Sequence, residues 1–222
     1  MPKQTLFNLP EEKRKMIIDT ALEEFGSRPY SKASLSRIVA RAGIAKGSMY
    51  QYFEDKKDLF VYLLELAAAE KLAYIQQEVD PKAEFFTACE QTILAGTRFG
   101  LNHPKLWHVM ANAMDTTGEE LLHEFIAKGK KMSQEYFSRM IRKGQEQGSI
   151  RRDIDIRLAA HMVSSMLSLG LMDYIMDLFG VGTLEELLVR PELGQKLTEK
   201  EVKKMSRELT KLLRNGLGKM SS

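Results

Sequence analysis

Apolar residues recur every three to four positions along most of this chain, which is the period of a helix with one buried face. The first such stretch runs from Pro10 to Phe25, and Ile17, Ala21 and Phe25 fall on one side of it. Gly26 suits the end of this helix. Runs that alternate between apolar and polar residues, as a half-buried strand requires, are few. The pattern therefore predicts an all-α protein.

Two shorter helices follow and can share a core with the first. Ser34 can cap one of them, and Gly43 stands where a left-handed residue would end it. The other begins near Ala45 and can turn Met49 and Phe53 inward at a spacing of four residues. Two short helices joined by a tight turn that contains glycine describe a helix-turn-helix. We therefore expect a three-helix, helix-turn-helix DNA-binding domain over residues 1–54.

The remaining residues, 55–222, are expected to form a second domain made of longer helices. Its first helix runs from about Asp55 to Val79 and ends before Pro81. Segment 181–195 is less periodic and reads as a connection that holds a short helix around 184–188. The other helices are expected at residues 82–101, 104–114, 119–147, 156–179 and 198–216.

The helix expected at residues 156–179 has almost no polar face, so it must be buried on most sides. A membrane span is the alternative, but His161, Asp173 and Asp177 interrupt the apolar run, which falls short of the about 18 residues needed. We infer that one side of this helix meets the core and another meets a second copy of the chain. The helix at 198–216 would complete this homodimer contact, and no membrane is expected as a partner.

Composition and charge limit where the protein can work and what it can bind. The 222 residues are 44% hydrophobic, which supports a real core, and the single cysteine excludes an internal disulfide framework. The N-terminus carries no apolar signal region, so we expect a cytoplasmic protein. Residues 27–53 hold five basic and no acidic side chains, a charge of +5, whereas the whole chain has only +3. A basic surface on a helix-turn-helix favours nucleic acid as the partner.

Residues 34–59 resemble the DNA-binding signature of the TetR/AcrR family of transcriptional regulators. That signature ends in Lys-Gly-x-hydrophobic-Tyr-x-Tyr/His-Phe, then a turn, then Lys-x-x-Leu. Here the run from Lys46 to Phe53, followed by Lys56 and Leu59, supplies each element in order. The segment 148–155 is similar to the family's turn before its penultimate long helix, with Gly148 and Asp155 as its helix stop and N-cap.

The resemblance implies an all-α, sequence-specific DNA-binding regulator, most simply a repressor. In that family a homodimer binds double-stranded DNA at a near-palindromic operator. The C-terminal domain, residues 55–222, would then serve both ligand binding and dimerisation, and a small molecule bound there would release the operator. No cofactor and no metal are implied.

Side-chain chemistry assigns roles to the residues that match the family signature. The hydroxyl and backbone N–H of Ser34 can contact a phosphate, and Gly47 lets the backbone approach DNA closely. Lys46 can reach a base edge or a phosphate, Gln51 can pair with adenine, and Lys56 can clamp a phosphate. Tyr50 and Tyr52 can donate phenolic hydrogen bonds to phosphates. The expected DNA-binding set is Ser34, Arg37, Lys46, Gly47, Ser48, Tyr50, Gln51, Tyr52 and Lys56.

Two positions depart from the common family pattern. Ala45 stands where a hydroxyl residue often caps the recognition helix, so one phosphate contact from a side chain is expected to be missing. Arg37 stands where an acidic residue is frequent, and it is either another DNA contact or a solvated charge. The operator sequence therefore does not follow by analogy.

Aromatic and methionine side chains of the C-terminal helices are the candidates for a ligand site. For each of these residues taken alone, packing in an ordinary core is the better explanation. As a set they favour a small apolar or aromatic ligand over a sugar or phosphate, and His108 could orient a polar group. The candidates are Phe85, Phe86, Phe99, Trp107, His108, Met110, Met114, Tyr136, Met140 and Met166.

Two other functions stay open at this level. A regulator controlled by a protein partner or by its abundance, without a small-molecule switch, would have the same sequence features. An all-α metal enzyme of the di-iron type needs two Glu-x-x-His motifs, and only Glu120 to His123 has that spacing. Since nucleophile-elbow, P-loop and dinucleotide-binding motifs are also missing, we expect no enzymatic activity. The regulated genes, the effector and the direction of regulation cannot be read from the chain.

Overall fold

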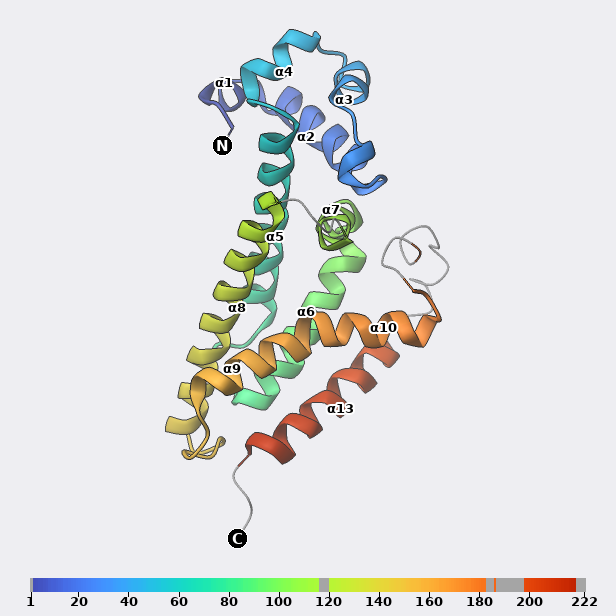
Figure 1. Cartoon of the computed structure of the whole chain (residues 1–222). Coiled ribbons are helices and arrows are strands. Elements are labelled where there is room, and N and C mark those ends of the chain that lie inside the picture. The colour runs from blue at the N-terminus through green and yellow to red at the C-terminus, as the bar shows by residue number, and fades with distance from the viewer. Residues whose placement is uncertain (1, 116–119, 183–185, 187–197, 219–222) are drawn as a thin grey trace. The chain divides into compact units, whose positions relative to one another are not determined.

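The computed structural model describes residues 2–115, 120–182, 186 and 198–218, and these ranges are helical without a β-strand, as predicted (Figure 1). An isolated antiparallel bridge joins Ile150 and Gly218. The helices are α1 (Gln4–Phe7), α2 (Glu11–Gly26), α3 (Leu35–Arg41), α4 (Lys46–Tyr52), α5 (Lys56–Glu78), α6 (Phe85–Asn102), α7 (Pro104–Asp115), α8 (Glu120–Glu146), α9 (Ile156–Ser165), α10 (Leu171–Phe179) and α13 (Glu199–Leu217), with a 3₁₀ turn at Tyr30–Lys32 and a π-helical turn at Met166–Gly170.

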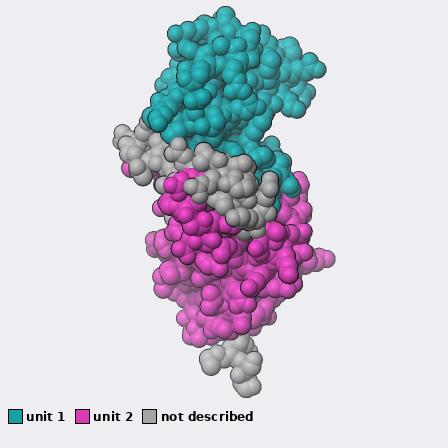
Figure 2. Space-filling view, turned by 90° about the vertical axis from the view of Figure 1, so that its right-hand side faces the viewer, with its two compact units in different colours: residues 1–72, 100–119 teal, residues 73–99, 120–222 magenta. Residues whose placement is uncertain are grey.

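Two compact units divide the chain, one of residues 1–72 with 100–119 and one of residues 73–99 with 120–222 (Figure 2). The first unit thus holds α7 as well as the helix-turn-helix. It is larger than the DNA-binding domain predicted at residues 1–54, and that functional boundary stays a prediction. The short helix predicted around 184–188 lies outside the residues that the structure describes, except for position 186.

The core of the first unit is built by the helices that the apolar pattern predicts. Ile17, Ala21 and Phe25 of α2 are fully buried, together with Ile38 of α3 and Met49 of α4. Helix α2 contacts α3, and α3 contacts α4. Because α3 and α4 have only seven residues each, they are held by packing against α2 and each other and not by their own helix propensity.

Helix α7 packs on α2 within this unit. Nδ2 of buried Asn112 in α7 lies within hydrogen-bond distance of the carbonyl oxygens of Phe25 (2.8 Å), Gly26 (2.9 Å) and Arg28 (3.2 Å), which share its two N–H groups. A Cβ at Gly26 would lie 3.1 Å from Cβ of His108, so glycine permits the close approach of the two helices. One amide group therefore satisfies carbonyls at the end of α2 that have no partner inside their own helix.

The second unit has its own apolar cluster, to which α6, α8, α9 and α13 contribute. Its buried members are Phe85, Phe86, Cys89, Phe137, Ile141, Ile150, Ala159, Ala160, Val163 and Leu213. Burial raises the pKa of the Cys89 thiol well above its usual range. The cysteine is therefore a small core residue.

The turn between α8 and α9 has the helix stop and the N-cap that the sequence predicted. Gly148 has a left-handed backbone with a φ of +77°, and Asp155 accepts a hydrogen bond from the backbone N–H of Leu158 at 2.7 Å. Gly144, one turn before the end of α8, faces Ile150, whose Cδ1 would lie 2.8 Å from an added Cβ. The chain can therefore fold back closely enough for α9 to pack along α8.

The apolar helix predicted at 156–179 differs from expectation in three respects. A π-helical turn at Met166–Gly170 separates α9 from α10. By length and hydropathy alone, residues 156–179 are also apolar enough to cross a membrane, contrary to the sequence expectation that this apolar run is too short. In the single chain this helix is also not buried on most sides, whereas the sequence predicted that it would be. Only one side of α9 contributes to the core cluster, through Ala159, Ala160 and Val163, whereas Leu158 and Met162 on the same helix are exposed.

Candidate nucleic-acid interface

Helices α3 and α4 are joined by a turn that needs its glycine. Gly43 has a φ of +62°, a left-handed conformation that side chains with a Cβ rarely adopt. The N–H of the next residue, Ile44, donates to the carbonyl oxygen of Val39 at 3.2 Å, which closes the end of α3. The helix-turn-helix predicted from residue types is present in the structure.

Helix α4 separates its residues into a buried side and an exposed side. Met49 and Phe53 are buried as predicted, at 1% exposure each, whereas Tyr50 is 46% exposed. Lys46, Gly47 and Gln51 are also exposed, and Ser48 is half-buried. A Cβ at Gly47 would meet no atom within 4 Å, so the backbone there is open to an approaching ligand. The exposed side carries the donors expected to face DNA.

Tyr52 lies on the other side of this helix, with only 5% of the residue exposed. Its ring therefore belongs to the core of the first unit. The predicted contact of its hydroxyl with a phosphate remains a prediction, and it concerns the hydroxyl alone.

Ser34 and Arg37 have a partner that the sequence pattern did not indicate, the buried carboxylate of Glu24 in α2. The backbone N–H of Ser34 donates to Oε1 of Glu24 at 2.9 Å, and Nε and Nη2 of Arg37 donate to the same oxygen at 2.8 and 2.5 Å. Nη2 of Arg37 also donates to the carbonyl oxygen of Lys32 at 2.6 Å. The N–H of Ser34 is thus occupied within the protein, and its side chain does not cap α3, which leaves the hydroxyl for the predicted phosphate contact.

Hydrogen bonds decide the ionisation of Glu24. Burial alone would raise the pKa of this carboxyl, but the hydrogen bonds from Arg37 and Ser34 and the nearby positive charges lower it below its usual value. Glu24 therefore stays ionised at neutral pH and keeps Arg37 in place. The sequence left two roles open for Arg37, a DNA contact or a solvated charge. The structure adds a third role, an ion pair with Glu24 inside the protein.

Part of the positive charge of residues 27–53 is neutralised in the folded protein by acidic side chains from outside this segment. Besides Arg37, Arg28 lies 3.9 Å from Glu24, and Arg41 pairs with Glu23. Both carboxylates come from α2, just before the counted window, so the simple count missed them. Lys46 is exposed at the start of α4 and places a positive charge on the helix that carries the exposed donors.

Lys56, at the start of α5, is held by the turn at Tyr30–Lys32. Its Nζ donates to the carbonyl oxygens of Tyr30 (2.7 Å) and Ala33 (3.1 Å) and lies 4.3 Å from the centre of the Tyr30 ring. An ammonium group has three N–H donors, so two are used here and one remains for a phosphate. The lysine is fixed in position before any DNA arrives.

Comparison with known proteins agrees with this geometry. The family profile described as "Bacterial regulatory proteins, tetR family" matches residues 17–63, the segment that holds α3 and α4. A crystal structure of a TetR family transcriptional regulator from Chloroflexus aurantiacus is 32% identical, covers 99% of this chain and 100% of its own, and superposes with a TM-score of 0.71. This chain belongs to the TetR family.

Two further relatives bear on regulation. The fatty acid metabolism regulator protein of Bacillus subtilis is 24% identical over 167 residues, which are 72% of this chain and 82% of that protein. A crystal structure of FadR from Bacillus subtilis in complex with stearoyl-CoA is 22% identical and covers 82% of this chain and 96% of its own, with a TM-score of 0.61. As a TetR-family protein, this chain is a sequence-specific DNA-binding transcriptional regulator.

The predicted ligand residues of the TetR-family protein are divided between the two units. Phe85 and Phe86 are buried in the cluster of the second unit, against which Tyr136, Met140 and Met166 pack. Phe99 is buried in the same unit, with its ring edge-on to Tyr74. The remaining candidates, Trp107, His108, Met110 and Met114, lie on α7 in the first unit, and the side chain of Met114 is outside the described residues.

The ring of Trp107 in α7 has a lysine of α5 beside it that the sequence analysis did not single out. Lys71 of α5 places Nζ 5.5 Å from the centre of the Trp107 ring, and burial lowers the pKa of this lysine. Burial likewise lowers the pKa of His108, so this imidazole is neutral at pH 7. A lysine within an alanine-rich stretch carries no periodic signal, and only the packing of α7 against α5 reveals its surroundings.

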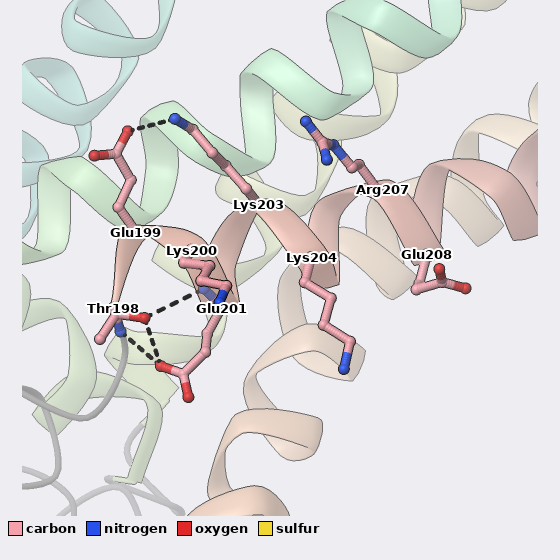
Figure 3. Close-up of a pocket in the computed structure, with 8 residues that line it drawn as sticks. All are labelled: Thr198, Glu199, Lys200, Glu201, Lys203, Lys204, Arg207 and Glu208. Atoms are coloured by element: carbon pink, nitrogen blue, oxygen red, sulfur yellow. Dashed lines mark hydrogen bonds and ion pairs between the residues drawn. The ribbon is translucent and has the colours of Figure 1, made fainter.

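A pocket of about 910 Å³ lies elsewhere, along the first half of α13 (Figure 3). Its lining is charged: Lys203 pairs with Glu199 at 3.1 Å, and Thr198 and Glu201 form a capping box at the helix start. None of the predicted ligand residues lines it, and its charge does not suit an apolar molecule. Among the residues that the structure describes, no group of three or more metal-ligating side chains was found.

Proposed function

We propose that this regulator works in the cytoplasm as a homodimer that represses transcription from a near-palindromic operator and leaves it when a small apolar ligand binds. The observation that carries the DNA-binding part of the proposal is the exposed side of α4. It presents the side chains of Lys46, Tyr50 and Gln51 to solvent, whereas the opposite side of the helix is buried in the core. A short helix presented in this way fits the major groove. The functional division into residues 1–54 and 55–222 is part of the proposal.

Each donor on this face has a distinct task in the proposal. Gln51 reads adenine through a bidentate hydrogen bond, and Lys46 reads a base edge or binds a phosphate. Tyr50 and the hydroxyl of Ser34 bind phosphates, and Lys56 does so with its remaining N–H. Phosphate contacts fix the register of the helix, whereas the base contacts select the sequence.

Exposed apolar side chains support a dimer through the second unit. Leu158 and Met162 of α9 are 63% and 58% exposed, Tyr174 and Leu178 of α10 are both 52% exposed, and Leu212 of α13 is 63% exposed. Large exposed apolar side chains gathered on neighbouring helices mark an interaction surface. Helix α13 packs against α9, because its Leu213 shares the core cluster of Ala159 (Figure 1). A second copy that meets these helices would form a two-fold dimer with two recognition helices.

The ligand part of the proposal rests on the apolar interior of the second unit and on the relatives. FadR of Bacillus subtilis has been seen with stearoyl-CoA, a molecule with a long acyl chain. The cluster around Phe85, Phe86, Tyr136, Met140 and Met166 has the chemistry to receive such a chain. Methionine side chains adapt their shape and would allow it to enter.

Selection of bound duplexes from a random pool tests the DNA part. The purified protein would be incubated with the pool at two salt concentrations, and the bound DNA sequenced. Enrichment of a near-palindrome at both concentrations supports the proposal. Weak binding that disappears at moderate salt without enrichment would reduce the interface to an electrostatic patch.

The selected operator then tests the ligand. Its affinity for the protein would be measured with long-chain acyl-CoA, with free coenzyme A and with a short-chain acyl-CoA as matched controls. The proposal expects release by the long chain only. A change of less than about twofold for every ligand would favour the regulator without a small-molecule switch.

A further inference from the structure

The N-terminal segment contacts the recognition helix at the residues that would face DNA. The backbone N–H of Lys3 donates to the carbonyl oxygen of Tyr52 at 2.8 Å, and its Nζ donates to that of Tyr50 at 2.9 Å. The hydroxyl of Thr5 donates to the carbonyl oxygen of Gln51, which lies between them in the chain. Figure 1 shows α1 beside α4, and both belong to the first compact unit.

These bonds complete the hydrogen bonding at the end of α4. The last four carbonyl groups of a helix have no partner inside it. In α4 they belong to Met49, Tyr50, Gln51 and Tyr52. The N–H of Phe53 serves the first of them at 2.9 Å, and the N-terminal segment serves the other three. The ammonium of Lys3 also lies at the negative end of the helix dipole, where a cation is stabilising.

An apolar anchor fixes this segment in the protein. Leu6 of α1 is fully buried, at 0% exposure. The N–H of Leu9 donates to the carbonyl oxygen of Leu6 at 3.3 Å, and Nη1 of Arg14 in α2 donates to that of Phe7 at 3.5 Å. Lys3 and Thr5 therefore reach α4 from a support that is itself packed into the core.

We propose that Lys3 and Thr5 are positioning residues for DNA recognition, which act by holding the last turn of α4. Seven residues make a helix too short to be stable alone, so the orientation of its last turn depends on outside contacts. Tyr50 and Gln51, whose side chains face outward, are the residues whose carbonyl groups receive these bonds. The inference rests on the proposed reading of DNA by α4.

The test compares near-isosteric variants on the selected operator and on unrelated DNA. Lys3→Met and Thr5→Val remove the donors and keep the bulk, and Lys13→Met, at an exposed lysine of α2, removes the same charge elsewhere. Loss of one hydrogen bond should weaken operator binding about five- to tenfold, while binding to unrelated DNA and the salt slope stay unchanged. Lys3→Arg should restore the affinity, because it keeps a cationic donor.

A second readout examines α4 without DNA. In the Lys3→Met, Thr5→Val double variant, the amides of α4 should exchange with solvent faster, while those of Ile17 and Phe25 in the core keep their protection. In a double-mutant cycle, Lys3→Met should add little to Gln51→Ala in the discrimination between bases. Additive losses would mean that Lys3 does not act through Gln51.

The outcomes separate the inference from the function on which it rests. A wild-type protein without any sequence preference would end the proposed DNA reading itself. A selective wild type with equally selective Lys3→Met and Thr5→Val variants would overturn only the positioning role. A uniform loss on all DNA, with the salt slope reduced by about 1 in Lys3→Met, would make Lys3 a direct phosphate contact instead.

Discussion

Glu24 of helix α2 and Arg37 of helix α3 form an ion pair in which the carboxylate is buried and the guanidinium remains 45% exposed. The same carboxylate oxygen accepts the backbone N–H of Ser34, where α3 begins. One ionised group therefore fixes the start of the first helix of the helix-turn-helix. The arginine at an unusual position for the family then has a partner within the protein.

Glu24→Gln should lower the free energy of unfolding at pH 7 by about 1–3 kcal/mol, since two hydrogen bonds from Arg37 lose their charged acceptor. Because the folded protein lowers the pKa of Glu24, this contribution is present above the usual value of 4.5 and disappears as pH falls through the lowered pKa. Denaturant unfolding of both proteins from pH 7 to pH 3 measures it. Glu12→Gln, at an exposed position of α2, should have little effect. A difference that persists unchanged at pH 3 would contradict this origin.

Lys56→Ala should weaken binding to every DNA sequence and reduce the salt slope by about 1, since it removes one phosphate contact. It should also destabilise the protein by about 1–3 kcal/mol, because the carbonyl groups of Tyr30 and Ala33 lose a charged donor. Binding titrations at several salt concentrations, paired with thermal unfolding, measure both effects. Lys57→Ala, at the exposed neighbouring lysine, is the control. Loss of stability with an unchanged salt slope would leave Lys56 a structural role only.

Gln51→Ala should relax the preference for one or two base pairs, with a cost of about 1–3 kcal/mol at those positions. The side chain of Gln51 is exposed, and its backbone carbonyl group keeps the hydrogen bond from Thr5 in the variant. The fold should therefore not change. Repeating the duplex selection with the variant shows which positions of the operator lose information. An equal loss of affinity for every sequence would argue that Gln51 does not read bases.

Leu212→Glu should convert the dimer to a monomer, because it places a charge among the exposed apolar side chains of α13, α9 and α10. Leu212 is 63% exposed in the single chain, so the substitution should leave the fold of each copy intact. Sedimentation measures the mass, and circular dichroism checks the helices. Leu101→Glu, at another exposed leucine on α6, serves as a control. A variant that stays dimeric would move the interface elsewhere.

The parts of this fold that depend on local periodicity were predictable. Gly43, Gly148 and Asp155 mark helix ends through their own backbone or side-chain chemistry, and the structure confirms all three. The inward positions Met49 and Phe53 follow from helix geometry alone. The motif that carries the DNA-binding function is of this local kind, so the sequence was sufficient to find it.

The features that sequence reasoning missed join residues far apart in the chain. Glu24 lies ten residues before Ser34, and nothing in its own surroundings marks it as buried. Helix α1 has only four residues, too few to show a period, so its contacts with α4 were invisible. Lys56 was expected to face DNA freely, and its two carbonyl partners come from a turn more than twenty residues upstream.

Cys89 lies fully buried in the second unit, where its thiol is held in the protonated form. Since the thiolate is the reactive species, thiol reagents should leave this residue untouched in the folded protein. Because the chain has a single cysteine, a new one placed on an exposed position would be labelled alone. A fluorophore or spin label can therefore be attached at a chosen position of either unit without first removing a cysteine, and its signal can be followed as a candidate ligand is added.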